Sequence, residues 1–395
     1  MDMLSKIQPE LPASVEHGLC SRFRTTKSYC TSCAAVCPVP GAVQFAEQGA
    51  EIQGAEITDA CVGCGACASA CPNGAISLKE SDPRLVERIR SRMRPGEAFR
   101  IACPRAEGKV DLVLPCLSRL TEVLLLEPIR SGAARVELLD PGCSGCGLNR
   151  AAPQWERSLF LARALCESAG FTASRVERVQ VSVGKPETRE ASESPNPRRA
   201  MFRAIADKWK ETATVAATEL EETGQLAVEP FREAVQRHHG NPKRTELLQV
   251  LRALPGAEAR SKSLPAAGLP LADVEVGGQC VGCNVCETLC PVGALRHRET
   301  NGVYALDFFP ALCTGCRVCE AACFYQAIRI RETVELSVLF NQPSVTLISA
   351  LRQTCRSCHE SFLGEASGVC PSCRVSGDRR ESIARNFFLG GTQDA

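Results

Sequence analysis

The feature that most constrains this chain is a run of four cysteines that occurs three times with the same spacing. In each copy two residues separate the first three cysteines from one another, and three residues precede the fourth. The copies begin at Cys61, Cys280 and Cys313. A partial copy ends at Cys37 and has Lys27 where its first cysteine would stand. Such regular repeats indicate a chain organised around its cysteines.

Composition indicates the cellular compartment in which these cysteines are expected. The chain has 25 cysteines among 395 residues, and its 46 basic and 45 acidic side chains leave a net charge of +1. That balance provides no basic field of the kind that attracts nucleic acid or a membrane surface. No apolar stretch is long enough for a signal peptide or a membrane span, so a cytoplasmic location is expected. In that reducing compartment, closely spaced cysteines bind metals or clusters in preference to forming disulfides.

The spacing fits a cubane iron–sulfur cluster. Three cysteines at intervals of three wrap around one corner of the cluster, while the fourth points towards a second cluster. Structural zinc fits poorly, because zinc favours two Cys-x-x-Cys pairs around one ion. The runs, together with the Pro-Asn-Gly-Ala-Ile and Pro-Val-Gly-Ala-Leu segments after Cys71 and Cys290, resemble bacterial-type two-cluster ferredoxins. The resemblance spans about residues 20–80 and 275–332.

The resemblance implies crossed ligation, in which each run lends its fourth cysteine to the cluster of the paired run. It assigns the two C-terminal [4Fe–4S] clusters to Cys280, Cys283, Cys286 and Cys323, and to Cys313, Cys316, Cys319 and Cys290. It assigns one N-terminal [4Fe–4S] cluster to Cys61, Cys64, Cys67 and Cys37. Phe324 stands where a proline usually follows the fourth cysteine, which should alter the chain exit without removing a ligand.

The remaining N-terminal cluster is irregular because Lys27 replaces a ligand. Cys20 is the nearest substitute, and nine residues separate it from Cys30. The site is then either a full cubane with an enlarged ligand loop or a labile three-iron cluster. The expected ligands are Cys20, Cys30, Cys33 and Cys71.

Between the two cysteine-rich segments the pattern changes to that of a small α/β sheet. Strands are predicted over residues 99–103, 110–114 and 135–139, with an apolar helix through Leu126 and another from Trp155 to the region before Gly170. Ligands commonly bind beyond the carboxyl ends of such strands. The cysteines placed there are Cys103, Cys116, Cys143 and Cys146. Cys166, in helical register with Leu159, is predicted to be a core thiol.

The order of these elements, with Asp140-Pro-Gly-Cys-Ser-Gly-Cys after the third strand, resembles the delta subunit of methyl-viologen-reducing hydrogenases. That family conducts electrons towards heterodisulfide reductase, and the resemblance implies a [2Fe–2S] cluster on the four middle cysteines. This chain lacks the family's closely paired first cysteines. Zinc and a redox-active dithiol are the alternatives. For a dithiol, Cys143 and Cys146 are the expected pair, because a Cys-x-x-Cys turn that opens a helix lowers a thiol pKa.

Residues 184–272 contain no cysteine and are predicted to be a linker followed by amphipathic helices. Phe202, Ile205 and Trp209 recur at helical spacing. Further on, Asn241 and Pro242 favour the start of a helix that continues to Leu254. These helices are expected to pack on their neighbours, with docking to a partner subunit as the alternative. His238 and His239 are assigned to a polar helix.

The tail carries two Cys-x-x-Cys pairs, which are typical of a tetrathiolate zinc ribbon. A single rubredoxin-type iron is the alternative. The ligands are Cys355, Cys358, Cys370 and Cys373.

The predicted fold class is α+β and multidomain: two ferredoxin-like dicluster modules flank a small α/β domain, with a helical linker and a C-terminal zinc ribbon. The predicted boundaries are 1–83 and 273–332 for the dicluster modules, 98–183 for the α/β domain, 184–272 for the linker and 333–395 for the tail.

The expected function is that of an intracellular polyferredoxin-type subunit that relays single electrons within an oxidoreductase complex and has no catalytic residue of its own. Because no Gly-x-Gly-x-x-Gly fingerprint occurs in a suitable place, flavoprotein or metalloenzyme partners are expected in a hetero-oligomer, without nucleic acid. The alternatives are an enzyme that reduces a disulfide or another substrate at the four middle cysteines, and a metal-dependent regulatory protein.

Overall fold

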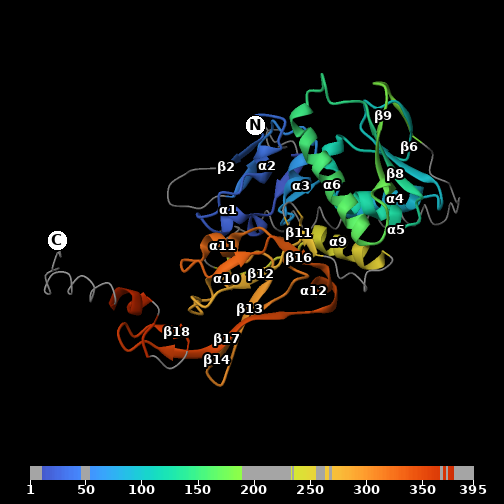
Figure 1. The fold of residues 1–395 in the computed structure, drawn as a ribbon. Coiled ribbons are helices and arrows are strands. Elements are labelled where there is room, and N and C mark those ends of the chain that lie inside the picture. The colour runs from blue at the N-terminus through green and yellow to red at the C-terminus, as the bar shows by residue number, and fades with distance from the viewer. Residues whose placement is uncertain are drawn as a thin grey trace, which may run out of the picture.

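The computed structural model describes residues 11–45, 54–188, 233, 235–254, 263–266, 269–364, 368–370 and 372–377. Within them the chain is a mixture of helices and strands. Figure 1 shows the blue N-terminal elements next to both the green middle elements and the orange C-terminal elements, with the red tail extending away. No helix in these ranges is long and apolar enough to cross a membrane. The helix predicted around Phe202, Ile205 and Trp209 lies outside the described residues.

The N-terminal elements form two short strand pairs joined by short helices. Both pairs are antiparallel: β1 (Ala13–Val15) with β4 (Ile76–Leu78), and β2 (Val43–Phe45) with β3 (Ala55–Ile57). The α-helices are α1 (Ser21–Arg24), α2 (Ser32–Ala35) and α3 (Ala66–Ala70). Segments this short depend on what they surround, because one turn of isolated helix is not stable.

The C-terminal elements repeat this plan. The first strand pair, β12 (Val274–Val276) with β15 (Ile328–Ile330), is antiparallel, as β1 is with β4. The second pair is extended into a four-stranded sheet in the order β13 (Leu295–Thr300), β14 (Val303–Phe308), β17 (Val345–Thr354) and β18 (Ser361–Leu363). The other elements are β11 (Ser263–Pro265), β16 (Thr333–Glu335), α10 (Val285–Thr288), α11 (Val318–Ala322) and α12 (Leu336–Asn341).

The middle elements form a parallel four-stranded sheet. Its order is β7 (Leu112–Val113), β5 (Ala98–Ala102), β8 (Arg135–Asp140) and β9 (Val176–Gln180). Its helices are α4 (Asp82–Arg92), α5 (Glu122–Arg130) and α6 (Ala152–Ser168). Sequence analysis did not identify α4.

Two details differ from the sequence prediction. The strand expected over residues 110–114 is interrupted at Asp111, which separates β6 (Gly108–Val110) from β7. The Asp111 carboxylate accepts a hydrogen bond from the Arg100 N–H at 2.8 Å, so a side chain competes with the strand ladder there. In addition, β10 (Pro186–Thr188) pairs in parallel with β6 inside the predicted linker.

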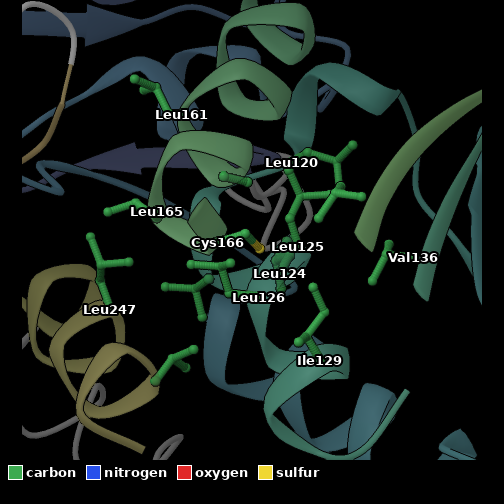
Figure 2. Packing of buried hydrophobic residues seen from close by; sticks show 14 of the residues in the cluster. Leu120, Leu124, Leu125, Leu126, Ile129, Val136, Leu161, Leu165, Cys166 and Leu247 are labelled. Carbon is green, nitrogen blue, oxygen red and sulfur yellow. The ribbon is translucent and has the colours of Figure 1, made fainter. Parts of the chain in front are cut away.

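The largest hydrophobic cluster joins the middle elements to α9 (Pro242–Ala253). As predicted, Asn241 caps this helix and accepts a hydrogen bond from the Arg244 N–H at 3.1 Å. Its leucines Leu247 and Leu251 are buried against the cluster, as Figure 2 shows for Leu247 beside the leucines of α5 and α6. The expected packing of this helix on its neighbours is confirmed.

Candidate cluster and metal sites

Three small cavities are each lined by four of the predicted ligands. Their linings are alike, with four cysteines among mostly apolar side chains, so they suit occupants of one kind. Each combines three cysteines of one run with the fourth cysteine of the paired run, as crossed ligation requires. We call them the outer N-terminal site (Cys37, Cys61, Cys64, Cys67), the outer C-terminal site (Cys280, Cys283, Cys286, Cys323) and the inner C-terminal site (Cys290, Cys313, Cys316, Cys319).

The fourth set of predicted ligands also comes together, and we call it the inner N-terminal site (Cys20, Cys30, Cys33, Cys71). Burial is the main cause that raises the pKa of Cys33 to about 12, and the nearby thiols of Cys71, Cys30 and Cys20 contribute. The Cys20 sulfur would lie 3.3 Å from a Cβ placed on Gly54, so this cysteine is held against the N-terminal module. The long loop between Cys20 and Cys30 therefore brings Cys20 to the other three cysteines.

The regular runs share one backbone geometry. In each, the residue before the second cysteine and the residue after it have positive φ angles. These residues are Gly63 and Gly65 (67° and 81°), Gly282 and Asn284 (70° and 62°), and Gly315 and Arg317 (68° and 61°). Alternation with left-handed residues turns successive backbone N–H groups inward, which favours bound anions such as thiolate clusters. Between Cys30 and Cys37 the irregular run has no residue with positive φ and forms α2 instead.

A second shared feature is an N–H···S hydrogen bond after the fourth cysteine. The N–H groups of Ala75, Ala294 and Ala327 donate at 3.3 Å to the sulfurs of Cys71, Cys290 and Cys323 respectively. Gln326, at φ 51°, occupies the position held by glycine in the other two turns. The turn after Cys323 therefore has the same form as the other two turns. The prediction that Phe324 alters the chain exit is wrong. Such bonds help to set a cluster's reduction potential.

The sites lie in single file. Burial raises the pKa of Cys64 to about 11, and Cys116 of the middle domain is close enough to contribute. The outer and inner N-terminal sites adjoin, because Cys33 contributes to the raised pKa of Cys67, which burial chiefly causes. The C-terminal sites adjoin in the same way through Cys319 and Cys286: burial is the first cause of the raised pKa of Cys319, and Cys286 adds to it.

The two inner sites meet across the interface of the modules. The Thr314 hydroxyl donates to Asn73 Oδ1 at 2.5 Å, and both residues are at most 2% exposed. Asn73 lies two residues after Cys71, whereas Thr314 lies between Cys313 and Cys316. Burial raises the pKa of Cys316 to about 11, and both side chains are close enough to its sulfur to act in the opposite direction. A short bonded route therefore joins the ligands of the two modules.

The four predicted middle ligands gather at one edge of the parallel sheet. They follow β5, β7 and β8, which are neighbours in the sheet. Burial raises the pKa of Cys103, with contributions from Cys116 and Cys146, and it raises the pKa of Cys143, with contributions that include the same two thiols. We call this group the middle site (Cys103, Cys116, Cys143, Cys146).

A tryptophan indicates an acceptor at the middle site. Trp155 is 1% exposed, and its indole Nε1 has no hydrogen-bond partner among the described residues. The indole lies close to the Cys143 sulfur. Burial raises the pKa of Cys143, and the indole lowers it by a smaller amount. Because a buried N–H without an acceptor is costly, a thiolate at Cys143 suits this position.

The four sulfur atoms of the tail cysteines lie close together. Within the described part of the chain, the group whose ligand atoms all lie within 4.8 Å of one another is the tail site (Cys355, Cys358, Cys370, Cys373). The sulfurs of Cys358 and Cys370 are 3.7 Å apart. Tetrahedral zinc with Zn–S bonds of ~2.3 Å requires about 3.8 Å between sulfurs. The tail site thus fits a single ion.

The tail site is built at the end of the extended C-terminal sheet. Strands β17 and β18 pair from Arg352 to Thr354, directly before Cys355. The N–H groups of Cys370 and Ser357 donate to the Cys355 sulfur at 3.3 and 3.4 Å. The first of these bonds is the main cause that lowers the pKa of Cys355 to about 6. A thiolate is therefore favoured there before any metal binds.

Cys166 belongs to the core, as predicted. It is 0% exposed, and Figure 2 shows its side chain among the leucines of α5 and α6. We expect Cys166→Ala to leave iron and zinc per chain unchanged and to lower the free energy of unfolding by about 1 kcal/mol, because only one buried sulfur atom is lost. Metal analysis and denaturant unfolding test this. A fall in iron would instead assign Cys166 to a cluster.

Two histidines near the inner C-terminal site were misassigned. His238 and His239 lie outside any helix, contrary to the sequence prediction. His238 Nδ1 is 2.9 Å from the Cys290 carbonyl oxygen, and the His239 N–H donates to the Pro291 carbonyl at 2.8 Å. The turn after Cys290 offers carbonyl acceptors that replace the helical hydrogen bonds of this segment. Only the tertiary fold brings that turn close, so no local signal identified it.

Comparison with known families agrees with the two cysteine-rich segments. Residues 56–77 match the 4Fe-4S binding domain, and residues 279–327 match the 4Fe-4S dicluster domain. A search of curated proteins found no match. Neither family match extends over the middle domain, so its likeness to the hydrogenase delta subunit stays a prediction. The chain is an iron–sulfur electron-transfer protein with ferredoxin-type [4Fe–4S] binding domains in its N-terminal and C-terminal halves.

Proposed function

We propose that this chain is a polyferredoxin-type subunit that relays single electrons along one file of sites. The order is the middle site, the outer N-terminal site, the inner N-terminal site, the inner C-terminal site and the outer C-terminal site. The single file carries the proposal: Cys116 adjoins Cys64, and the Asn73–Thr314 contact joins the two modules. A chain that only stored iron would have no need for this continuity between domains.

The residues of the chain have three tasks in this function. Four thiolates at each ferredoxin site bind all the corners of a cubane and leave no open coordination position for a substrate. Buried ligands such as Cys313 and Cys319, each 8% exposed, exclude water from the inner C-terminal site. The N–H donors of Ala75, Ala294 and Ala327 orient the thiolates and tune their charge. Bound clusters supply reversible one-electron transfer.

For the middle site we propose a [2Fe–2S] cluster held by Cys103, Cys116, Cys143 and Cys146. These cysteines follow neighbouring strands, and Cys116 packs beside Cys64 of the outer N-terminal site, which supports a redox cluster in the file over zinc. The Trp155 indole supports a charged sulfur at Cys143. A redox-active dithiol at Cys143 and Cys146 is the competing assignment, and it would make the chain an enzyme. For the tail we propose zinc, on the basis of the 3.7 Å sulfur spacing.

Partners follow from the chemistry. A file of one-electron sites has two ends, so electrons must be delivered at one end and removed at the other by separate redox proteins. We propose flavoprotein or metalloenzyme subunits in a hetero-oligomer. One of them would dock by the middle site and the other by the outer C-terminal site, where Cys283 is exposed.

Metal and sulfide analysis of the anaerobically purified full-length chain tests the proposed function. We expect about eighteen iron atoms per chain, from four cubanes and a two-iron middle site, and about one zinc. Dithionite should reduce the clusters, and electron paramagnetic resonance should detect a [2Fe–2S] signal. NADH should not be turned over by the isolated chain.

The other outcomes discriminate between the alternatives. About sixteen iron atoms without a [2Fe–2S] signal would assign the middle cysteines to zinc or to thiol chemistry, and would favour the disulfide-reducing enzyme. About fifteen iron atoms in the ferredoxin sites would indicate a three-iron inner N-terminal site. Turnover of NADH by the pure chain would contradict an electron-transfer subunit that depends on partners.

A further inference from the structure

Three cations surround the two inner sites and donate their hydrogen bonds to neutral carbonyl groups. Arg24 and Arg244 are 1% and 4% exposed, and Lys243 is half-buried beside the latter on α9. None of the three forms an ion pair with a carboxylate among the described residues, although the chain has many such pairs elsewhere. A buried charge is costly unless an opposite charge compensates it. These cations therefore indicate a negative charge close by.

Arg24 lies between the modules, next to the inner C-terminal site. Its guanidinium donates at 2.6, 2.5 and 2.6 Å to the carbonyl oxygens of Gly18, Val235 and Arg237. Burial lowers the pKa of Arg24, while Cys290 and Cys316 are the strongest opposing influences and outweigh Glu16. His238, which follows Arg237, lies with its Nδ1 2.9 Å from the Cys290 carbonyl oxygen, so Arg24 is held beside the inner C-terminal site.

Arg244 and Lys243 approach the same pair of sites from α9. Arg244 donates to the carbonyl oxygens of Ala311, Pro270 and Pro310 at 3.1, 2.6 and 3.0 Å. Burial lowers the pKa of Arg244 to about 10, and Cys313 is the group that opposes it. The Lys243 ammonium donates to the carbonyl oxygens of Ala68, Ser69 and Cys71 at 3.2, 2.5 and 3.2 Å. Its charge therefore lies between the inner N-terminal site and the buried Glu122 carboxyl, whose pKa burial raises and Lys243 lowers.

The outer sites have a different electrostatic surrounding. At the outer C-terminal site burial raises the pKa of Cys280 and Arg352 lowers it. The Arg352 guanidinium is also paired with Glu299 at 2.9 Å. At the outer N-terminal site Arg119 packs against Gly65, but its guanidinium is likewise paired, with Asp82. Reduction adds one negative charge to a cluster, so nearby unpaired cations favour the reduced state and thereby raise the reduction potential. Burial disfavours the added negative charge and therefore lowers the reduction potential.

We propose that the two inner sites form an electron reservoir, in which Arg24, Lys243 and Arg244 hold an added electron more firmly than either outer site can. This inference rests on the proposed function and adds an order of potentials to it. The Asn73–Thr314 contact joins the two halves of the reservoir, so an electron arriving at one module is shared with the other. Electrons entering from either end then collect at the centre until a partner withdraws them.

A redox titration followed by electron paramagnetic resonance tests the reservoir on the full-length chain. Two of the four cubanes should be reduced before the other two, and Cys316→Ser should alter one of the early signals and so assign it. In Arg24→Met, the reduction equilibrium of that cluster should shift towards the oxidised form by roughly tenfold, which is about 59 mV for one electron. Arg24→Lys retains the charge and should recover most of the shift.

Further variants separate charge from folding. Arg175→Met is the matched control, because Arg175 also donates to a carbonyl, that of Ala133 at 3.0 Å, but lies in the middle domain. It should leave all four potentials unchanged. If Arg24→Met fails to fold, Arg244→Met and Lys243→Met provide the same measurement. Unchanged potentials in the variants with full iron content, or outer clusters that are reduced first, would overturn the reservoir. Missing iron in the unaltered chain would overturn the proposed function instead.

Discussion

Replacing Cys319 by alanine is expected to remove about four iron atoms per chain and to separate the outer C-terminal site from the rest of the file. Cys319 is 8% exposed and faces Cys316, Cys313 and Cys290. It also contributes to the hydrophobic cluster of the C-terminal module, which contains Tyr304 and Phe308. Alanine cannot bind iron, so the cluster would be lost, and this core would lose the group around which it packs.

Iron and sulfide analysis measures the first effect, and electron paramagnetic resonance measures the second. In the reduced variant the outer C-terminal cluster should lose its magnetic coupling to a neighbour, because the inner C-terminal site was adjacent to it through Cys286. Cys166→Ala is the matched control, since it replaces another buried cysteine by the same residue. Full iron content in Cys319→Ala would contradict the assignment of this ligand.

Sequence analysis grouped the cysteines well, because ligand spacing is a local property. The run that starts at Cys280 specifies three ligands within seven positions, and the paired run supplies the fourth through a known crossing. The same locality explains why the cap at Asn241 was predicted correctly. Even Cys20, which is displaced from the regular pattern, was found by elimination, because few other cysteines lie near the missing position.

The surroundings of the sites were not predictable in this way. Asn73 and Thr314 are separated by 241 residues and meet only because two modules pack together. From the sequence, Arg24 would be predicted to be an ordinary surface arginine. It is instead buried and donates to the carbonyl of Val235, 211 residues away. These contacts depend on the arrangement of the modules, for which the chain has no local signal. The order of the sites, and hence the reservoir, could be inferred only from the structure.

The packing around Gly65 also cannot be predicted from the sequence. Its replacement is the second change for which we expect a large effect. The residue after the second cysteine has positive φ in all three regular runs, but Asn284 and Arg317 hold this position in the other two. A side chain is thus compatible with the backbone. At Gly65, however, a Cβ would overlap the Arg119 Cδ and lie 3.1 Å from Leu78. Close packing by Arg119, more than the φ angle, requires glycine here.

Gly65→Ala is therefore expected to lower the free energy of unfolding by about 3 kcal/mol and to deplete iron from the outer N-terminal site. To admit the methyl group, Arg119 must leave its nearly buried ion pair with Asp82, and a buried carboxylate without its partner costs ~3–5 kcal/mol. Denaturant unfolding together with iron analysis measures both effects. Gly65→Ala combined with Arg119→Ala should cost less than the sum of the two single variants, because the overlap is then relieved.

Arg317→Ala is the matched control, since it places the same alanine at the equivalent position, with φ 61°. Its only expected loss is the exposed ion pair with Glu320, worth about 0–1 kcal/mol, and its iron content should stay complete. If Gly65→Ala combined with Arg119→Ala lost as much as the sum of the two single variants, the φ angle would be the cause and the Arg119 contact would be irrelevant. If only Gly65→Ala loses iron, the middle domain, through Arg119, helps to shape the ligand loop of its neighbouring site. The domains along the file would then be coupled structurally at the point where electrons pass between them.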